Sequence, residues 1–426
     1  MEPSLNRHKR VFYRLHGREV TEFGNVDPSE ATSSVMAALS SVGRLAWFGR
    51  GWVIQEVLLS STACVYWGNA DFDFEWMRPA FTTSHLQWDL SLTRLLIYLT
   101  CGNRKAVVTL FTLLTMTTES KFSEEKDRIY ELMGLSTLEW DPREGQPFVD
   151  PDYSITTMEC FRRVSVKLLV EAKYLRVLSW AQHKTSIVDE SWPSWVTCYT
   201  MPATHVFADF YDGETGVHET ASLTNISKAT RGVFECIDIS GFKIGTVSLK
   251  NRQYVDTYGA VRGPEGRMHM RHLHQLQNSY SPKYLACTFA QTDTLLRPGS
   301  NRIATLMEDY HAFVNGAVPW PPNSDPFAEP PRPDAEGFFE ECAIVKYGHQ
   351  VFQIESTGML GLGPEAMRAG DVVVALHGAN VPFMLRAARD GLWKLVGECQ
   401  IYEFSRGKVT REWKESGSGS ETFCIC

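Results

Sequence analysis

At 426 residues the chain exceeds what a single ordinary hydrophobic core accommodates, which predicts two or three domains. Hydrophobic residues make up 43% of the sequence and charged residues 22%, proportions that exclude general disorder. The formal net charge of −8 gives no overall attraction to nucleic acid or to an anionic membrane. We therefore expect a globular protein that does not bind nucleic acid.

Targeting and membrane signals are weak. Residues 1–20 carry charge but no apolar core, so we find no secretory signal in them and expect a cytoplasmic protein. The most apolar stretch, 94–116, is interrupted by GNRK at 102–105, and neither half reaches the ~20 residues of a membrane span. The ten cysteines form no CxxC pair, which is typical of buried thiols in a reducing compartment. We expect no disulfide framework, no metal and no other cofactor.

Helical spacing of apolar residues dominates the chain up to about residue 135. The best-marked helix lies in FSEEKDRIYELMGLS, where Ser123 offers an N-cap and Gly134 stands where the chain should leave the helix. A second long amphipathic helix is predicted over 154–180. The other elements expected in this part are a helix over 31–47, a short helix over 51–59 and a β run over 62–68.

The later part of the chain is mixed. Residues 233–250 alternate around Gly241 like a hairpin, and 268–316 are mainly helical in pattern. The proline-rich segment 318–337 predicts a linker, because proline fixes φ and lacks a backbone donor. Short β runs beyond it predict a small barrel or sandwich, with the glycines of 358–363 in tight turns. These β runs cover 342–347, 351–356, 371–378, 381–388, 392–398 and 401–405.

The last segment, ESGSGSETFCIC, has the composition of a flexible tether. Its Cys424 and Cys426 resemble the doubly prenylated end of Rab-type GTPases. No GTPase phosphate loop is found in the sequence, so a disordered end is the favoured interpretation.

The stretch RLAWFGRGWVIQEVLLSSTACVYWG, residues 44–68, combines indole rings with a few polar side chains. We interpret it as core, in which Arg50 forms a bidentate clamp with Glu56. The alternative makes Glu56 a general base in an aromatic cleft. The apolar side chains expected to be buried here are Trp52, Val53, Ile54, Val57 and Leu58.

Other chemistry is less well marked. His269, His272 and His274 could ligate zinc or iron, but no cysteine or carboxylate completes a known spacing, so a solvated helix face is favoured. No Gly-x-Ser-x-Gly elbow is found. If the protein is an enzyme, the candidate catalytic residues are Glu56, Asp127 and His272.

Several motifs stand in a fixed order along the chain: FGRGWVIQEVLLSSTACVYWG, SEEKDRIYELMGLS, VDPDYSITTMECFRRVS and SWPSWVTCY. Together they resemble the signature of the fungal heterokaryon incompatibility (HET) domain family. The runs VFQIESTGMLGLGPEAMRAGDVVVALHGANVPFMLR and LWKLVGECQIYEF are similar to the C-terminal part of the same proteins. The resemblance covers most of residues 40–408.

The resemblance carries over to individual positions. The matching residues are Arg50, Trp52, Gln55 and Glu56; Asp127, Arg128, Ile129, Tyr130, Leu132, Gly134 and Leu135; Asp152, Tyr153 and Ser154; Trp195; and, as two late turns, Gly363 with Pro364 and Gly370 with Asp371. Where the family has Pro-Ser-Trp-Val-Pro-Asp-Trp, this chain has PSWVTCY at 193–199, which puts any role of that aspartate in doubt.

The family's ALSYxWG-like and WIDxxCINQ-like segments are not found, and residues 1–45 are too few to hold that half of the domain. The resemblance thus implies a partial, TIR-like (Toll/interleukin-1 receptor-like) HET element, with two alternatives: the gene model has lost its front, or this is a natural short member of the family. The expected fold class is α+β, mainly helical at first and β-rich at the C-terminus. The expected regions are a partial HET-like domain 1–140, a mixed helical and β region 141–317, the linker 318–337, a β-rich domain 338–408 and a flexible tail 409–426.

Two functions follow from the resemblance. The first is a non-enzymatic incompatibility factor that binds another protein and promotes cell death in fungal non-self recognition. The second is a cyclase- or isomerase-type enzyme of secondary metabolism that binds a small metabolite. Fold analogy does not separate them, because function depends on sites, and the first is preferred.

Overall fold

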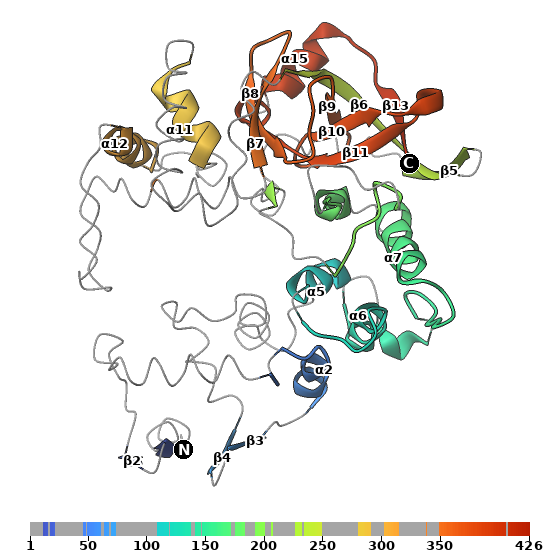
Figure 1. The fold of residues 1–426 in the computed structure, drawn as a ribbon, viewed down its shortest axis with the longest axis vertical. Helices are drawn as coiled ribbons and strands as arrows, with labels where there is room; N and C mark the ends of the chain where they lie inside the picture. The colour runs from blue at the N-terminus through green and yellow to red at the C-terminus, as the bar shows by residue number, and fades with distance from the viewer. Residues whose placement is uncertain are drawn as a thin grey trace, which may run out of the picture. The chain divides into compact units, whose positions relative to one another are not determined.

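The computed structural model divides the chain into two compact units. Unit 1 contains residues 1–157 and 199–202, and unit 2 contains residues 158–198 and 203–426. Figure 1 traces both units. The structure describes residues 12–15, 18–21, 46–47, 49–60, 64–67, 70–73, 109–118, 120–137, 141–145, 147–171, 175–183, 192–200, 206–207, 226–231, 234–248, 280–290, 302–314, 338, 349–405 and 408–426.

Unit 1 is built from short helices and two small antiparallel hairpins. Helix α5 is an example of how these helices are held. The Thr109 hydroxyl accepts a hydrogen bond from the Thr112 backbone N–H at 3.0 Å and caps the helix start. The leucines of α5 and Phe111 are buried. The elements are β1 (Phe12–Leu15), β2 (Arg18–Thr21), α2 (Trp52–Leu59), β3 (Cys64–Trp67), β4 (Ala70–Asp73), α5 (Leu110–Met116), α6 (Asp127–Tyr130) and the 3-10 helices η3 (Leu132–Gly134) and η4 (Pro142–Glu144).

The helix expected in FSEEKDRIYELMGLS is shorter than predicted. It consists of the single turn α6 followed by η3, and Lys126, not Ser123, precedes it. The Glu131 carbonyl oxygen explains the change of helix type. It accepts the Gly134 backbone N–H at 3.0 Å and the Gln55 side-chain amide at 2.6 Å, so the last turn tightens.

The helix expected over 154–180 is likewise broken into pieces: α7 (Thr157–Val166), a π-helical turn η5 (Lys167–Glu171) and a 3-10 helix η6 (Leu175–Trp180). Two further helices, α11 (Pro282–Ala290) and α12 (Arg302–Val314), lie within the expected helical segment 268–316. The proline-rich segment 318–337 lies outside the described residues.

A nine-stranded sheet forms the centre of unit 2, and together with the helices it confirms an α+β fold (Figure 1). Its order is β12-β8-β7-β6-β13-β11-β10-β9, with β5 beside β6 and a further pairing of β9 with β6. The strands are β5 (Ile226–Arg231), β6 (Phe234–Ser248), β7 (His349–Ile354), β8 (Leu360–Pro364), β9 (Val372–Leu376), β10 (Phe383–Ala387), β11 (Trp393–Glu398), β12 (Gln400–Ile401) and β13 (Glu421–Ile425).

The predicted hairpin at 233–250 is wrong, because β6 is one continuous strand of 15 residues. Its first half pairs with β5 and β13, and its second half pairs with β9 and β7. Gly241 is needed here for close approach: a side chain at this position would overlap the Ala375 carbonyl oxygen. Gly241 marks the place where β9 packs closely against β6, and not a turn.

The flexible tail predicted for 409–426 is also wrong. It forms helix α15 (Lys408–Ser416) and the internal strand β13. Phe423 and Ile425 are fully buried, and Trp413 of α15 stacks on Phe242 with ring centroids 4.4 Å apart. These apolar side chains hold the segment in place, whereas the composition of GSGS describes only the turn between helix and strand. Cys424 lies within the sheet and not on a free tether.

Two smaller expectations need correction. Residues 402–405 form a helical turn, α14 (Tyr402–Ser405), in place of a strand. Gly361 and Gly363 lie inside β8, where side chains would overlap the Phe352 ring and the end of Met384. These glycines allow close packing, which is a different use of the residue from the tight turns expected.

Candidate functional site

The family-like segments of unit 1 meet around α2 and α6. The chain before α2 is anchored by backbone hydrogen bonds, from the Lys121 N–H to the Gly49 carbonyl oxygen at 2.6 Å and from the Gly51 N–H to the Lys121 carbonyl oxygen at 3.1 Å. The Phe122 ring occupies the space that a side chain at Gly51 would need. Val53 and Ile54 are each 1% exposed and form the inner face of the helix.

The outer face of α2 differs from the prediction. Trp52, expected in the core, is 44% exposed, and Leu59 is 62% exposed. Glu56 lies between them and is also exposed. Positions separated by four and then three residues share one side of a helix, so these three side chains form a single outward stripe. We call Trp52, Glu56 and Leu59 the α2 stripe.

The predicted Arg50–Glu56 clamp is wrong: within the described part of the chain no ion pair joins them, and both residues are exposed. Glu56 therefore faces solvent instead of occupying an internal cleft. Gln55, in contrast, has an internal partner. Its Nε2 donates to the Glu131 backbone oxygen at 2.6 Å, and Gly134 leaves the space that this amide fills.

Glu131 was missed by the sequence analysis. Its side chain is 3% exposed, and neither carboxyl oxygen has a hydrogen-bond partner among the residues that the structure describes. The pKa of Glu131 is raised to about 8, mainly by burial and to a smaller extent by the negative charges of Asp127 and Glu56. Glu131 therefore carries a proton at neutral pH. The four-residue spacing from Asp127 is the sequence signal that could have found this acidic pair.

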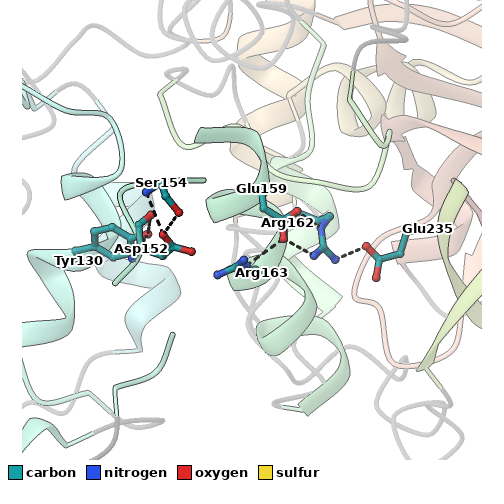
Figure 2. A network of polar contacts seen from close by, with 7 residues as sticks. All are labelled: Tyr130, Asp152, Ser154, Glu159, Arg162, Arg163 and Glu235. Atoms are coloured by element: carbon teal, nitrogen blue, oxygen red, sulfur yellow. Dashed lines mark hydrogen bonds and ion pairs between the residues drawn. The ribbon is translucent and has the colours of Figure 1, made fainter. Parts of the chain in front are cut away.

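Asp127 and Tyr130 tie α6 to the Asp-Tyr-Ser motif. The Tyr153 hydroxyl donates to Asp127 Oδ1 at 2.5 Å, while the Tyr130 hydroxyl donates to the Asp152 carbonyl oxygen at 3.0 Å. The Asp152 carboxylate in turn accepts from the Ser154 backbone N–H and hydroxyl at 3.0 and 2.6 Å (Figure 2). These polar groups hold one segment of the chain against another.

The two neighbouring cations serve the same purpose. Arg128 is 3% exposed, and its guanidinium donates to the carbonyl oxygens of Thr117 and, at 3.0 Å, of Ser120. These carbonyls follow α5, so the cation lies near the negative end of that helix. The Lys126 ammonium donates to the carbonyl oxygens of Tyr153 and Ile155 at 2.7 and 2.9 Å.

In unit 2, Trp195 is completely buried, and its indole N–H donates to the Glu235 carbonyl oxygen at 3.3 Å. The Glu235 carboxylate accepts from Arg162 of α7, which also binds Glu159 at 2.6 Å, and Glu159 accepts from Arg163 at 3.0 Å (Figure 2). This network joins α7 to β6.

The late family-like positions have structural roles as well. Gly370 has φ 91°, which favours glycine, and Asp371 follows it. The Asp371 carboxylate accepts from Arg386 Nε and Nη2, each at 2.8 Å, and from the Arg368 backbone N–H at 2.7 Å. Arg386 was not singled out from the sequence. The expected turn at Gly363 and Pro364 is instead part of β8.

The three candidate catalytic residues are not assembled into one site by the described structure. Glu56 is exposed on α2, Asp127 is buried and bound to Tyr153, and His272, with His269 and His274, lies outside the described residues. Over the ranges that are described, no three His, Cys, Asp or Glu side chains are placed to hold a metal ion. No described helix is long and apolar enough to cross a bilayer.

Comparison with known proteins identifies a similarity for one part of the chain. Residues 331–416 match the family model of the Het-6 beta-barrel domain. Neither the curated proteins nor the solved structures that were searched include a match. The matched segment contains β7 to β12 and α15, and it points to the fungal HET-related proteins.

Proposed function

We propose that this protein is a heterokaryon-incompatibility-like factor that acts through protein contacts in fungal non-self recognition and cell death. The observation that carries the proposal is the match of residues 331–416 to the Het-6 beta-barrel domain, which fits an incompatibility-like role. The order of the family-like motifs in unit 1 supports the same function.

The use of the polar motif residues favours partner binding over catalysis. Gln55, Lys126 and Arg128 donate to backbone carbonyls, and Tyr130 does the same. Groups engaged in this way hold the fold together. A catalytic centre needs titratable groups that converge on a place where substrate can bind.

The α2 stripe is the surface that we assign to the partner. Trp52 and Leu59 present large apolar side chains to solvent on either side of the Glu56 carboxylate. Tryptophan is enriched among the residues that dominate binding energy in protein interfaces. A partner segment that fits this stripe presents apolar side chains next to a lysine or arginine.

Expression of the whole chain in a filamentous fungus from an inducible promoter tests the proposal. We expect wild type to stop colony growth and to admit a vital dye into the cells. The double variant Trp52→Ser, Leu59→Ser is expected to relieve both effects at equal abundance of folded protein. Tyr66→Ser is the matched control, because this ring is 82% exposed but lies on β3 and not on α2. Abundant, folded wild type that leaves growth unchanged would contradict the proposal.

We further propose that the sheet of unit 2 closes into a barrel. The support is the pairing of β9 with β10 on one side and with β6 on the other, so that hydrogen-bonded neighbours lead from β6 through β13, β11 and β10 to β9 and back. Hydrogen exchange tests this closure. In a barrel every β9 amide exchanges slowly, whereas an edge strand would exchange fast at alternate residues.

A further inference from the structure

Unit 2 contains a cluster of cysteines that none of the roles described above uses. Strand β13 pairs antiparallel with β6, so that Ile425 faces Ile237 and Cys424 faces Asp238. The next step of this register sets Cys426 opposite Cys236. Because side chains alternate along a strand, Cys424 and Cys426 point to the same face of the sheet, and Cys236 points there with them.

The packing agrees with the register. The three cysteines share one apolar cluster with Leu392 and Ala388, and none of the three forms a disulfide in this structure. Burial, and after it the neighbouring thiols of Cys424 and Cys426, raises the pKa of Cys236 to about 12. The Cys236 thiol therefore lies close to each of the other two.

The spacing suits a covalent bond between the two opposing thiols. Directly opposed residues of antiparallel strands have Cα atoms about 4.5–5.5 Å apart. Disulfides span Cα distances of about 4.4–6.8 Å. By the same register Cys424 is the diagonal neighbour of Cys236, and the Cα atoms of diagonal positions typically lie about 7–8 Å apart. The register thus favours Cys426 as the partner of Cys236.

The thiols differ in their access to solvent. Cys236 is completely buried and Cys424 is 9% exposed, while Cys426 is only partly buried. Lys394 lies close enough to Cys426 to oppose the effect of burial on its pKa, although burial is the larger influence and the pKa remains raised. A small oxidant in solution reaches Cys426 first.

We propose that Cys236 and Cys426 form a modification site at which peroxide oxidises the two thiols to a disulfide. The Cys426 thiol gives up its proton as its sulfur attacks one peroxide oxygen. The O–O bond breaks, the departing hydroxide takes that proton and leaves as water, and Cys426 becomes a sulfenic acid. The Cys236 thiol then gives up its proton and attacks this sulfur. The S–S bond forms, the S–O bond breaks, and the departing hydroxide takes the second proton and leaves as water. Two electrons from the two thiols reduce one peroxide to two waters.

The bond would lock β13 into the sheet. In the reduced protein the end of β13 is held by non-covalent contacts, namely hydrogen bonds from the Cys426 N–H to the Trp393 carbonyl oxygen at 2.8 Å and from the Ser194 N–H and hydroxyl to the Cys426 carbonyl oxygen. A covalent bond to β6 removes the freedom of this strand to leave its place between β6 and β11.

Peptide mapping of the full-length protein tests the site directly. Reduced wild type is treated with hydrogen peroxide, its remaining thiols are alkylated, and it is digested without reductant. We expect a peptide pair linked through Cys236 and Cys426, a higher midpoint of thermal unfolding, and loss of both changes on addition of dithiothreitol.

Two variants sharpen the test. Cys426→Ser is expected to abolish the linked pair and the thermal shift, whereas Cys424→Ser, in the same strand, keeps both. Mapping in wild type does not depend on how a variant folds. A link between Cys236 and Cys424, links between chains only, or Cys426 oxidised to a sulfinic acid with Cys236 still alkylatable would each overturn the proposal.

Discussion

Units 1 and 2 each bury a carboxyl group, but only the group in unit 2 has an ion-pair partner among the described residues. Glu131 of unit 1 and Asp371 of unit 2 are each 3% exposed. Asp371 receives two hydrogen bonds from Arg386 and one from a backbone N–H, whereas the oxygens of Glu131 receive none from described residues. Equal burial therefore leads to an ion pair in one unit and to a proton-carrying acid in the other.

The two carboxyl groups differ because the cations of the two units have different hydrogen-bond partners. The two cations that stand close to Glu131 in the sequence, Lys126 and Arg128, donate to backbone carbonyls of other segments. Unit 1 thus uses its positive charges to join chain segments and leaves a carboxyl group neutral. Unit 2 uses Arg386 to bridge β10 and the turn before β9, where its Nη2 also reaches the Ala366 carbonyl oxygen at 2.7 Å.

Removing the cation from the Asp371 pair should have the largest effect. Arg386→Met leaves a buried carboxylate without its ion-pair partner, which we expect to cost about 3–5 kcal/mol in the free energy of unfolding. Arg143→Met is the matched control, because its pair with Asp141 lies at the surface and the arginine side chain is 82% exposed. The control is expected to change stability by less than about 1 kcal/mol. Urea unfolding measures both, and equal losses would contradict the comparison.

The opposite behaviour is expected of Glu131, whose pKa of about 8 lies above its ordinary value of 4.5. Between these pH values the unfolded chain loses this proton while the folded protein keeps it, so stability falls as pH rises through this window. Below it, both states are protonated and the effect vanishes.

Glu131→Gln removes this titration. The free energy of unfolding of wild type minus that of the variant should therefore fall from pH 5 to pH 8, by on the order of 1–4 kcal/mol. Taking the difference cancels the titration of the groups that do not interact with Glu131. Chemical denaturation across this pH range measures it, and a difference that stays flat or rises would show that Glu131 is ionised or paired.

The smallest effects on stability are expected on the α2 stripe. Trp52→Ser should change the free energy of unfolding by less than about 1 kcal/mol, because Trp52 is already 44% exposed in the folded protein. Ile54→Ala, two residues along the same helix, should cost about 2–4 kcal/mol, since Ile54 is 1% exposed. Thermal or urea unfolding of the two variants compares them. A large loss for Trp52→Ser would make that residue part of the core and remove the surface assigned to the partner.

Much of the fold was predictable where a strong local pattern meets a packed face. The runs at 351–356, 371–378, 381–388 and 392–398 correspond to β7, β9, β10 and β11, because short apolar runs bounded by turn residues are typical of strands buried in a sheet. The long strand β6 was not predictable, because a glycine such as Gly241 indicates a turn when the local sequence is considered alone. Its role in close packing becomes apparent only when β9 is known to lie against β6.

Individual residues of the candidate site were predictable from the sequence, but the contacts between them were not. The sequence singled out Gln55, Asp127 and Tyr130, but their partners lie in other segments. The partners of Gln55 and Tyr130 are backbone carbonyls, which no side-chain motif marks. Trp52 was misplaced because hydrophobicity alone does not say which side of a short helix faces the core. Glu131 was overlooked because its significance arises from burial, which composition does not report.

The family-like residues of unit 1 hold chain segments together, and the Gln55 amide beside Gly134 is the contact at which this is best tested. The measurement is a double-mutant cycle of unfolding free energies for Gln55→Ala, Gly134→Ala and the two combined. The added methyl group at Gly134 would displace the Gln55 amide from the Glu131 carbonyl oxygen, so we expect non-additive losses with a coupling of about 0.5–3 kcal/mol. Strictly additive losses, or no loss for Gln55→Ala, would contradict it and leave Gln55 free for another role.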